Sequence, residues 1–422
     1  MTDGKPLTAI GEWKRYGMVP LAAMIGYSTM AIQTYGVGPF VTSLEGEFGW
    51  TRAQVMIGLT ISNTLGVFFN FLVGVLADRI GPRRVGIAGV VVKASAIMML
   101  ATASSAILSW QLLWVLVGIG AVLAQANVWA SAVASRFDRG RGFAIAVALS
   151  GSSFCAAIIP VIATWLIGEF GWRMAFVWLG GGWMALALPV VLLWFRGERD
   201  EQREAAKDAN AAGQEQAQIV ELPGLSIGQG LRRPAFWQLL VASFAFASYT
   251  MSVAPNLVPM LGEKGSAPAQ AAVLAGLVGV VGWIARSSAG FLLDIMSARL
   301  LGTIVFLLPV LGCGMLLGDA PSYWVLTACV VSFGITIGAE YDVVFYLVSR
   351  HFGLKSFASL MGGMLTVGAF GGAVAPYFSG WLHDTFGNYN PMLMVLMGLM
   401  ALGALAIATM GRAPAEYALQ RH

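Results

Sequence analysis

The chain has 422 residues, of which 58% are hydrophobic and only 11% charged, with 52 glycines and a formal net charge of +4. A soluble domain could not bury that much apolar surface, so the composition excludes a soluble globular protein and indicates a polytopic helical membrane protein. The three cysteines, Cys155, Cys313 and Cys329, lie in apolar runs without the spacing of a metal or disulfide framework. We expect them to be small core residues.

Twelve apolar runs are long enough to cross about 30 Å of hydrocarbon. Six are predicted at roughly 17–41, 54–77, 85–104, 108–134, 142–167 and 173–195, and six more at roughly 235–261, 268–293, 299–317, 322–348, 357–382 and 391–410. The stretch between the two sets is charged and then Ala/Gln-rich, too polar to stay in the bilayer, and favours a solvated linker with room for a short surface helix. The predicted organisation is a six-helix bundle over 1–195, a cytoplasmic linker over 196–233 and a second six-helix bundle over 234–422.

The lysines and arginines indicate the orientation. Of the 25 basic residues, only Arg52, Arg173 and Lys264 fall in loops predicted to lie outside, while Lys93 and Arg286 fall within apolar spans. The others lie in the segments that are inside when the N-terminus is cytoplasmic, as the positive-inside rule requires. We therefore expect both termini to be cytoplasmic and the chain to lie in the cell inner membrane.

An internal repeat relates the two sets of six spans. A shift of 216 residues brings identical residues into register at equivalent places in both sets. Such a repeat favours two parallel halves that form a substrate cavity near the bilayer midplane. The same shift pairs Asn70 with Arg286, so a neutral amide faces a permanent cation, which favours a small anion. Among the matched pairs are Pro39 with Pro255, Gly74 with Gly290, Asp78 with Asp294 and Trp165 with Trp381.

The segment 74–84, Gly-Val-Leu-Ala-Asp-Arg-Ile-Gly-Pro-Arg-Arg, follows the second span. It resembles the loop motif of the major facilitator superfamily, which implies an all-α membrane protein with twelve transmembrane helices in two pseudo-symmetric six-helix bundles. An aspartate at a helix end, beside arginines, can bond helix termini of the other half and close the cytoplasmic side. Simple positive-inside anchoring is the alternative. The predicted gating residues are Asp78, Arg79, Arg83, Arg84 and, in the degenerate second copy, Asp294.

Two further segments resemble monocarboxylate transporters. The stretch 135–144, followed by small residues and Gly151-Ser152, is similar to the start of the fifth span in that family, although close packing and anchoring also explain it. Ala285-Arg286-Ser287-Ser288-Ala289-Gly290 resembles the eighth-span signature, whose arginine binds the substrate carboxylate. That family usually has an aspartate one turn earlier, where this chain has Gly282. The related oxalate/formate antiporters add a lysine in the eleventh span, which is missing here after Lys355, so a dicarboxylate held by two cations is disfavoured.

Arg286 and two carboxyls of the tenth span are the ionisable groups that we expect to carry function. Arginine keeps its charge at every accessible pH, and burying it in hydrocarbon is costly without an anion. Helix rise puts Asp342 and Arg286 each about 12 Å from the inner end of their spans, so a carboxyl at that depth could exchange the proton that drives symport. Residues two apart point about 200° apart, so only one of Glu340 and Asp342 can face the cavity. We favour Asp342; a structural pair without a transport role remains open.

Other polar and aromatic residues on the first, second, fourth and seventh spans are candidates for the cavity wall, although each is individually as well explained by packing. Lys93, in the third span, favours snorkelling or a local pairing, with substrate binding as the alternative. The predicted substrate-binding residues besides Arg286 are Tyr35, Asn70, Gln125, Trp129, Tyr249 and Asn256.

The sequence contains no phosphate-binding glycine loop with lysine, metal-ligand cluster or catalytic triad signature. We therefore expect a transporter driven by gradients, not an enzyme, without a cofactor or nucleic-acid partner and functional as a monomer. The prediction is a secondary transporter that moves a small aliphatic or aromatic monocarboxylate together with a proton. The alternatives are an anion exchanger without proton coupling and a non-transporting carboxylate receptor.

Overall fold

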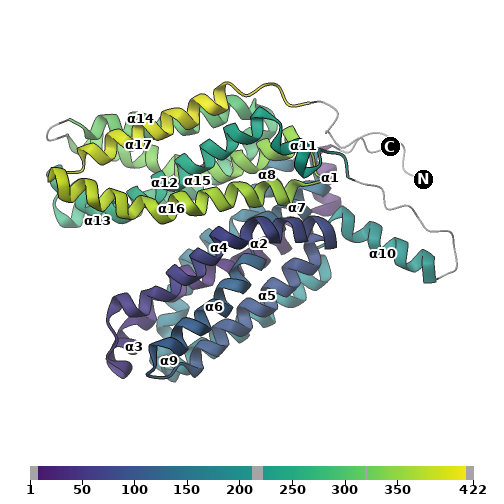
Figure 1. Cartoon of the computed structure of the whole chain (residues 1–422), viewed down its shortest axis with the longest axis horizontal. Helices are drawn as coiled ribbons and strands as arrows, with labels where there is room; N and C mark the ends of the chain where they lie inside the picture. The colour runs from purple at the N-terminus through teal and green to yellow at the C-terminus, as the bar shows by residue number, and fades with distance from the viewer. Residues whose placement is uncertain (1–7, 212–221, 319–320, 415–422) are drawn as a thin grey trace. The chain divides into compact units, whose positions relative to one another are not determined.

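The computed structural model describes residues 8–211, 222–318 and 321–414. Within these ranges the regular secondary structure is helical, apart from an isolated bridge between Gly224 and Gly353. The chain folds into two compact units (Figure 1). Of the described residues, the first contains those up to Gly224 together with Gly353–Gly362, and the second contains Leu225–Phe352 and those from Gly363 onward.

The helices of the first unit depart from the predicted spans at three places. The fourth span is interrupted at Gln125, whose backbone is extended (φ −68°, ψ 154°), and the fifth is interrupted at Ser150. The fifth and sixth spans are joined in one helix that turns at Gly171, where φ is 73°, a value that glycine tolerates because it has no Cβ. The unit contains α1 (Ala9–Tyr16), α2 (Met18–Gly36), α3 (Val41–Phe48), α4 (Arg52–Ile80), α5 (Pro82–Met99), α6 (Ile107–Leu123), α7 (Ala126–Arg136), α8 (Arg141–Leu149), α9 (Gly151–Trp194) and α10 (Glu198–Ala211), with 3-10 turns at Gly38–Phe40 and Leu100–Thr102.

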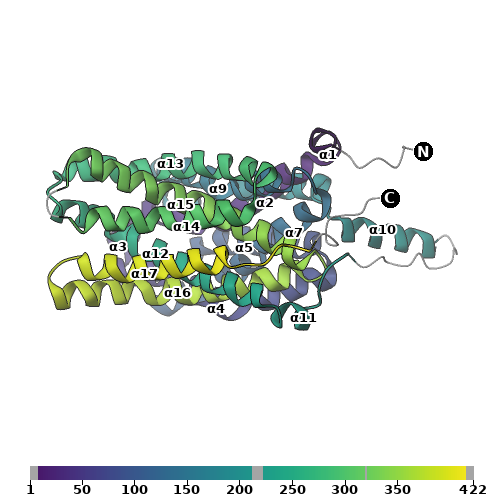
Figure 2. The same cartoon turned by 90° about the horizontal axis from the view of Figure 1, so that it is seen from above.

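The helices of the second unit follow the predicted spans more closely (Figure 2). One helix, α16, begins in residues that belong to the first unit and continues into the second. The unit contains α11 (Ile227–Leu231), α12 (Pro234–Glu263), α13 (Pro268–Ile295), α14 (Ala298–Leu316), α15 (Tyr323–Phe352), α16 (Phe357–Phe386) and α17 (Asn390–Ala408).

Local sequence explains where several helices begin. The Thr51 side chain accepts a hydrogen bond from the Gln54 amide, and the Gln54 side chain accepts one from the Thr51 amide. This reciprocal capping satisfies two donors that the start of α4 would otherwise leave unpaired. Pro82 and Pro234 stand at the first positions of α5 and α12, where a missing N–H costs nothing.

Ten stretches among the described residues are long and apolar enough to cross a membrane. One of them, Val161–Trp194, runs across Gly171 and so takes in the sixth predicted span and part of the fifth. The first predicted span corresponds to the 19-residue α2, which is not among the ten and carries the polar residues Ser28, Thr29 and Gln33. The chain is therefore a multi-pass, all-helical membrane protein, as its composition predicts.

Glycines allow a close helix crossing in the second unit, between α13 and α15. A Cβ at Gly338 would overlap the backbone of Gly282, and a Cβ at Gly282 would lie 3.3 Å from the Gly334 carbonyl oxygen. Small residues let transmembrane helices approach to backbone contact. This crossing holds α15 against the part of α13 that carries Arg286.

The Gly338→Ala variant tests this crossing. We expect it to cost about 1–3 kcal/mol, because the added methyl meets backbone that has no room to move. The matched control is Gly276→Ala on α13, where a Cβ would meet nothing within 4 Å. Thermal denaturation of the detergent-purified proteins should give a lower Tm for the first variant alone. Equal Tm values would contradict the close crossing.

Candidate functional site

Arg286 of α13 lies beside Asp342 of α15. Its Nε donates to the Gly338 carbonyl oxygen at 3.2 Å and lies 3.5 Å from Asp342 Oδ2. The arginine side chain is 12% exposed, whereas Asp342 is fully buried. Gly338 and Asp342 are one helical turn apart on α15, so they share the face that the glycine crossing holds against α13. The result is a guanidinium and a carboxylate in contact inside a membrane helix pair.

Glu340 lies on the opposite face of α15, against α14. Thr336 and Val343, which flank Glu340 on that face, both contact α14: the Thr336 hydroxyl donates to the Val305 carbonyl oxygen at 2.8 Å, and Val343 packs on Gly302. Glu340 is 1% exposed, and neither of its oxygens has a hydrogen-bond partner among the described residues. Asp342 lies 3.5 Å from Arg286 Nε, and its oxygens likewise have no hydrogen-bond partner among the described residues.

Asp342 brings a carboxyl to Arg286 from the neighbouring helix, whereas Gly282 leaves α13 without an acid one turn before Arg286. A Cβ at position 282 would lie 3.3 Å from the Gly334 carbonyl oxygen of α15, so a side chain there would require a small shift of the two helices. The carboxyl of Asp342 reaches Arg286 at the crossing that Gly282 and Gly338 form.

The other predicted contacts in the second unit are engaged in packing. Tyr249 is fully buried, with its ring 5.7 Å from that of Phe333, and its hydroxyl has no hydrogen-bond partner in the described part of the chain. Asn256 donates to the Ser252 carbonyl oxygen at 2.8 Å and accepts from the Tyr389 hydroxyl at 3.3 Å.

The predicted contacts of the first unit differ in accessibility. Asn70 is buried and accepts a hydrogen bond from the Gln125 amide at 3.3 Å, so the structure brings these two residues together. Trp129 is fully buried: its indole donates to the Ala124 carbonyl oxygen at 2.9 Å, and Gly26 accommodates its ring. Tyr35 is exposed.

Lys93 is held inside the first unit by neutral acceptors. It is fully buried, and its Nζ donates to Gln33 Oε1 and, at 3.1 Å, to the Val117 carbonyl oxygen. Gln33 also accepts from the Ser62 hydroxyl at 2.8 Å. The local pairing predicted for this lysine therefore describes its setting, whereas the snorkelling alternative is wrong because the side chain stays in the core.

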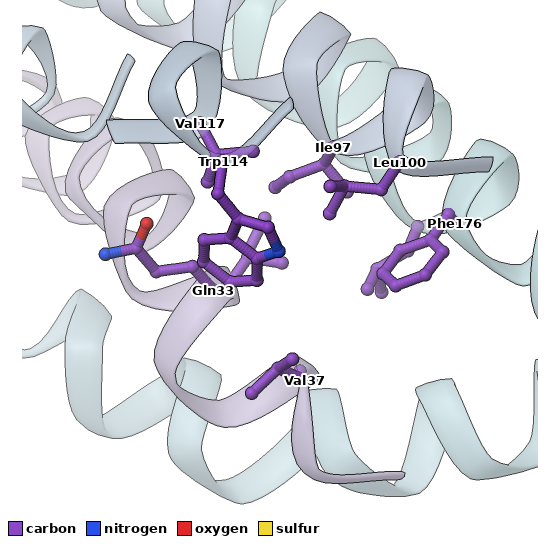
Figure 3. A pocket seen from close by; sticks show the side chains of 10 residues that line it. Gln33, Val37, Ile97, Leu100, Trp114, Val117 and Phe176 are labelled. Carbon is purple, nitrogen blue, oxygen red and sulfur yellow. The ribbon is translucent and has the colours of Figure 1, made fainter. Parts of the chain in front are cut away.

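A small pocket lies beside Gln33 (Figure 3). Its cavity volume of about 10 Å³ is close to the minimum that holds one water molecule. Apolar side chains of α2, α5, α6 and α9 form the rest of the wall, which is too tight for an organic acid. Its labelled lining residues are Gln33, Val37, Ile97, Leu100, Trp114, Val117 and Phe176.

The predicted gating aspartate binds the start of α16. Asp78 Oδ2 accepts from the Ser359 amide at 2.8 Å and from its hydroxyl at 2.6 Å, and Oδ1 accepts from the Ala358 amide at 3.3 Å. Arg199 of α10 also contacts Oδ1, at 3.1 Å. Sequence reasoning missed Arg199 because the linker was expected to be solvated; the mixed charges of 198–204 were the available signal.

The remaining predicted gating residues lie around the same helix ends. Arg83 donates to Glu204 and to the Leu192 carbonyl oxygen, both at 2.6 Å. The side chains of Arg79 and Arg84 are exposed, and Asp294 is half-buried close to the end of α13.

A fold of long apolar helices with buried charged groups defines the chain as a polytopic membrane protein of the transporter class. The family model described as Major Facilitator Superfamily matches residues 23–376. The chain belongs to that superfamily. The relatives and solved structures that it resembles are transporters and not enzymes.

The comparisons with curated proteins confirm the resemblance to monocarboxylate transporters, at low identity. Monocarboxylate transporter 12 of Rattus norvegicus is 27% identical over 302 residues, which are 67% of this chain and 62% of that protein. Monocarboxylate transporter 13 of Bos taurus is 24% identical over 403 residues, covering 93% and 88% of the two chains. Monocarboxylate transporter 3 of Rattus norvegicus is 28% identical over 360 residues, covering 84% and 71%.

Two solved structures share the fold. The E. coli fucose:proton symporter FucP matches with a TM-score of 0.70 and 13% identity, covering 95% of this chain and 100% of that one. The proton:xylose symporter XylE, bound to 6-bromo-6-deoxy-D-glucose, matches with a TM-score of 0.69 and 13% identity, covering 97% and 98%. At this identity the likeness establishes the fold alone.

The Lys93→Met variant tests the structural role of the buried lysine. Methionine has a similar length and removes a buried charge, so we expect a folded protein whose stability changes by no more than about 2 kcal/mol. Uptake should keep a KM within about twofold of the wild-type value, because the ammonium binds neutral groups of its own bundle. A large rise in KM at unchanged Tm would show instead that Lys93 contacts the substrate.

Proposed function

We propose that this protein is a secondary active transporter that moves a small monocarboxylate together with a proton by alternating access. The observation that carries the proposal is the contact between Arg286 and Asp342 inside a pair of membrane helices. The curated relatives named as monocarboxylate transporters support the substrate class, and the basic residues support cytoplasmic termini.

Arg286 is the proposed anchor of the substrate carboxylate. A guanidinium offers a planar fork of donors that matches a carboxylate, and placing a charge in the hydrocarbon region costs at least about 3 kcal/mol. The Nε of Arg286 donates to the Gly338 carbonyl oxygen at 3.2 Å and lies 3.5 Å from Asp342 Oδ2. The 12% exposure of the side chain leaves an approach for a small acid.

Asp342 is the proposed proton carrier. When a substrate carboxylate binds Arg286, it competes with Asp342 for the same positive charge. A fully buried carboxyl that loses its counter-charge favours its neutral form, so binding of the substrate promotes uptake of a proton. Release of the substrate returns Arg286 to Asp342 and expels that proton. Glu340, which lies on the α14 face, stands outside this exchange.

Asn70 and Gln125 are the proposed polar contacts of the first bundle, since both are amides and are already joined by a hydrogen bond. We keep Tyr35 and Asn256 as wall residues. Trp129 and Tyr249, both fully buried, are proposed to shape the cavity from behind its surface.

Loss of the anchor should abolish transport. We expect Arg286→Ala to lower kcat/KM for monocarboxylate uptake into proteoliposomes by about 30-fold or more, the usual effect of losing a buried charged partner. Arg286→Lys keeps the charge without the fork and should be intermediate. The control is Arg299→Ala, because Arg299 binds the Met410 carbonyl oxygen away from this pair. Normal uptake by Arg286→Ala would refute the anchor.

The two acids of α15 provide a matched test of coupling. We expect Asp342→Asn to lose the dependence of uptake on an inward proton gradient while it still exchanges substrate across the membrane. Glu340→Gln, an equally conservative change two residues away, should keep that dependence. Uptake at several imposed gradients distinguishes the variants. If wild-type uptake ignores the gradient and needs an internal carboxylate, the protein is an anion exchanger; binding without flux would make it a receptor.

A further inference from the structure

We propose that the linker helix α10 is a cytoplasmic clamp, in which Arg199 is the positioning residue that holds the start of α16 on the first unit. The use of such a clamp in alternating access rests on the proposed function. Its contacts and its test stand without a substrate.

Helix α10 is docked through its charged side chains. Glu201 pairs with Arg136 at the end of α7, and Glu204 pairs with Arg83 of α5 at 2.6 Å. Arg203 donates to the carbonyl oxygen of Arg79 at the end of α4. A single exposed ion pair contributes about 0–1 kcal/mol, but these contacts form a network on three helices within two turns of α10. The linker is therefore attached to the bundle and not merely solvated.

Asp200 anchors the start of α10. It is 7% exposed and accepts a hydrogen bond from the Gly197 amide at 2.9 Å. Burial raises the pKa of the Asp200 carboxyl, while backbone hydrogen bonds from Gly197 and Arg83 oppose that rise. The carboxylate lies against Gly81, whose φ of 95° suits glycine and where a Cβ would come 2.5 Å from Asp200 Oδ1. The loop motif thus leaves room for this acid.

Arg199 joins two segments that are far apart in the sequence. One terminal nitrogen donates to the Asp78 carbonyl oxygen at 2.6 Å and to its Oδ1 at 3.1 Å. The other donates to the carbonyl oxygens of Leu354, at 3.1 Å, and Lys355. The rigid fork of a guanidinium allows four such bonds at once. Arg199 therefore ties the end of α4 to the turn that precedes α16.

The same aspartate caps α16. Asp78 receives the amides of Ala358 and Ser359 in the first turn of that helix, where a negative charge is favoured by the helix dipole. Asn127 of α7 donates to the Ala358 carbonyl oxygen at 3.0 Å, and Gly74 provides the space for this close approach. Residues 353–362 are consequently part of the first unit although α16 continues into the second.

This arrangement gives the linker a mechanical role. A rearrangement of the second unit must either carry the start of α16 along, and break the bonds to Asp78 and Arg199, or leave it behind and bend the helix. Because Arg199 belongs to the linker, undocking of α10 would release the bonds to Leu354 and Lys355 and leave Asp78 alone to hold the start of α16. The clamp therefore stabilises the state in which α16 begins on the first unit.

The test measures exposure of Ser356, which is 7% exposed at the start of α16. The Ser356→Cys protein has a suitable background because Cys155, Cys313 and Cys329 are all buried. We expect Arg199→Gln to speed maleimide labelling of this reporter about tenfold, the effect of losing a charged hydrogen bond. Arg196→Gln is the control, since Arg196 pairs with Glu204 at an exposed position on the same linker.

Arg199→Lys keeps the charge but cannot reach all four acceptors, and we expect it to label about threefold faster than the wild type. This variant replaces Arg199→Gln in the labelling test if Arg199→Gln does not give a monodisperse protein. Labelling of the folded Arg199 variants at the wild-type rate, or an equal increase with Arg196→Gln, overturns the clamp. Because labelling needs no substrate, a failure of monocarboxylate uptake would refute the proposed function and leave the clamp standing.

Discussion

The approach of α13 and α15 at Gly282 and Gly338 is the constraint on which the candidate site depends. Two glycines at one crossing remove the side chains that would otherwise separate the helices. That approach brings the Gly338 carbonyl oxygen and Asp342 within reach of a single guanidinium. Without it, Arg286 would need another anion or would have to reach water, because a charge in hydrocarbon is not tolerated unpaired. Packing of two glycines therefore gives the charge of Arg286 its partners.

The two acids of α15 show how position decides chemistry for residues of the same kind. Asp342 lies on the α13 face, 3.5 Å from Arg286 Nε, whereas Glu340 lies on the α14 face; neither carboxyl has a hydrogen-bond partner within the described residues. A carboxyl without a counter-charge in a dry environment is stable only in its neutral form. In the proposed exchange, Asp342 changes its charge when Arg286 is taken by a substrate anion, and Glu340, on the other face of α15, makes no ion pair with that arginine among the described contacts.

Much of this arrangement follows from sequence, but not all. Hydropathy and length predict the helices and the membrane, and the 3.6-residue period predicts that Glu340 and Asp342 lie on different faces of their helix. The interruptions at Gln125 and Gly171 escape prediction because apolar runs look continuous on either side of them. Trp129 and Tyr249 are residue types that suit a cavity wall, but both side chains are buried in the core. Sequence does not tell which face of a buried helix meets a neighbouring helix. The mixed charges of 198–204 could have marked Arg199, but its partners Asp78 and Leu354 could not be predicted, because they are distant in sequence and only the fold brings them together.

The two charged assemblies of the chain follow the same electrostatics in different surroundings. A pair of unit charges 4 Å apart is worth about 4 kcal/mol at an effective dielectric constant of about 20, but only about 1 kcal/mol in bulk water. The Asp78–Arg199 contact, with side chains 11% and 16% exposed, lies among polar backbone at helix ends, where water can replace each bond as it breaks. Asp342 is fully buried, so water cannot readily replace the guanidinium, and in the proposed cycle a proton or a substrate anion compensates when the pair separates. In that cycle the first contact opens and closes with the conformation, whereas the second opens when a ligand arrives.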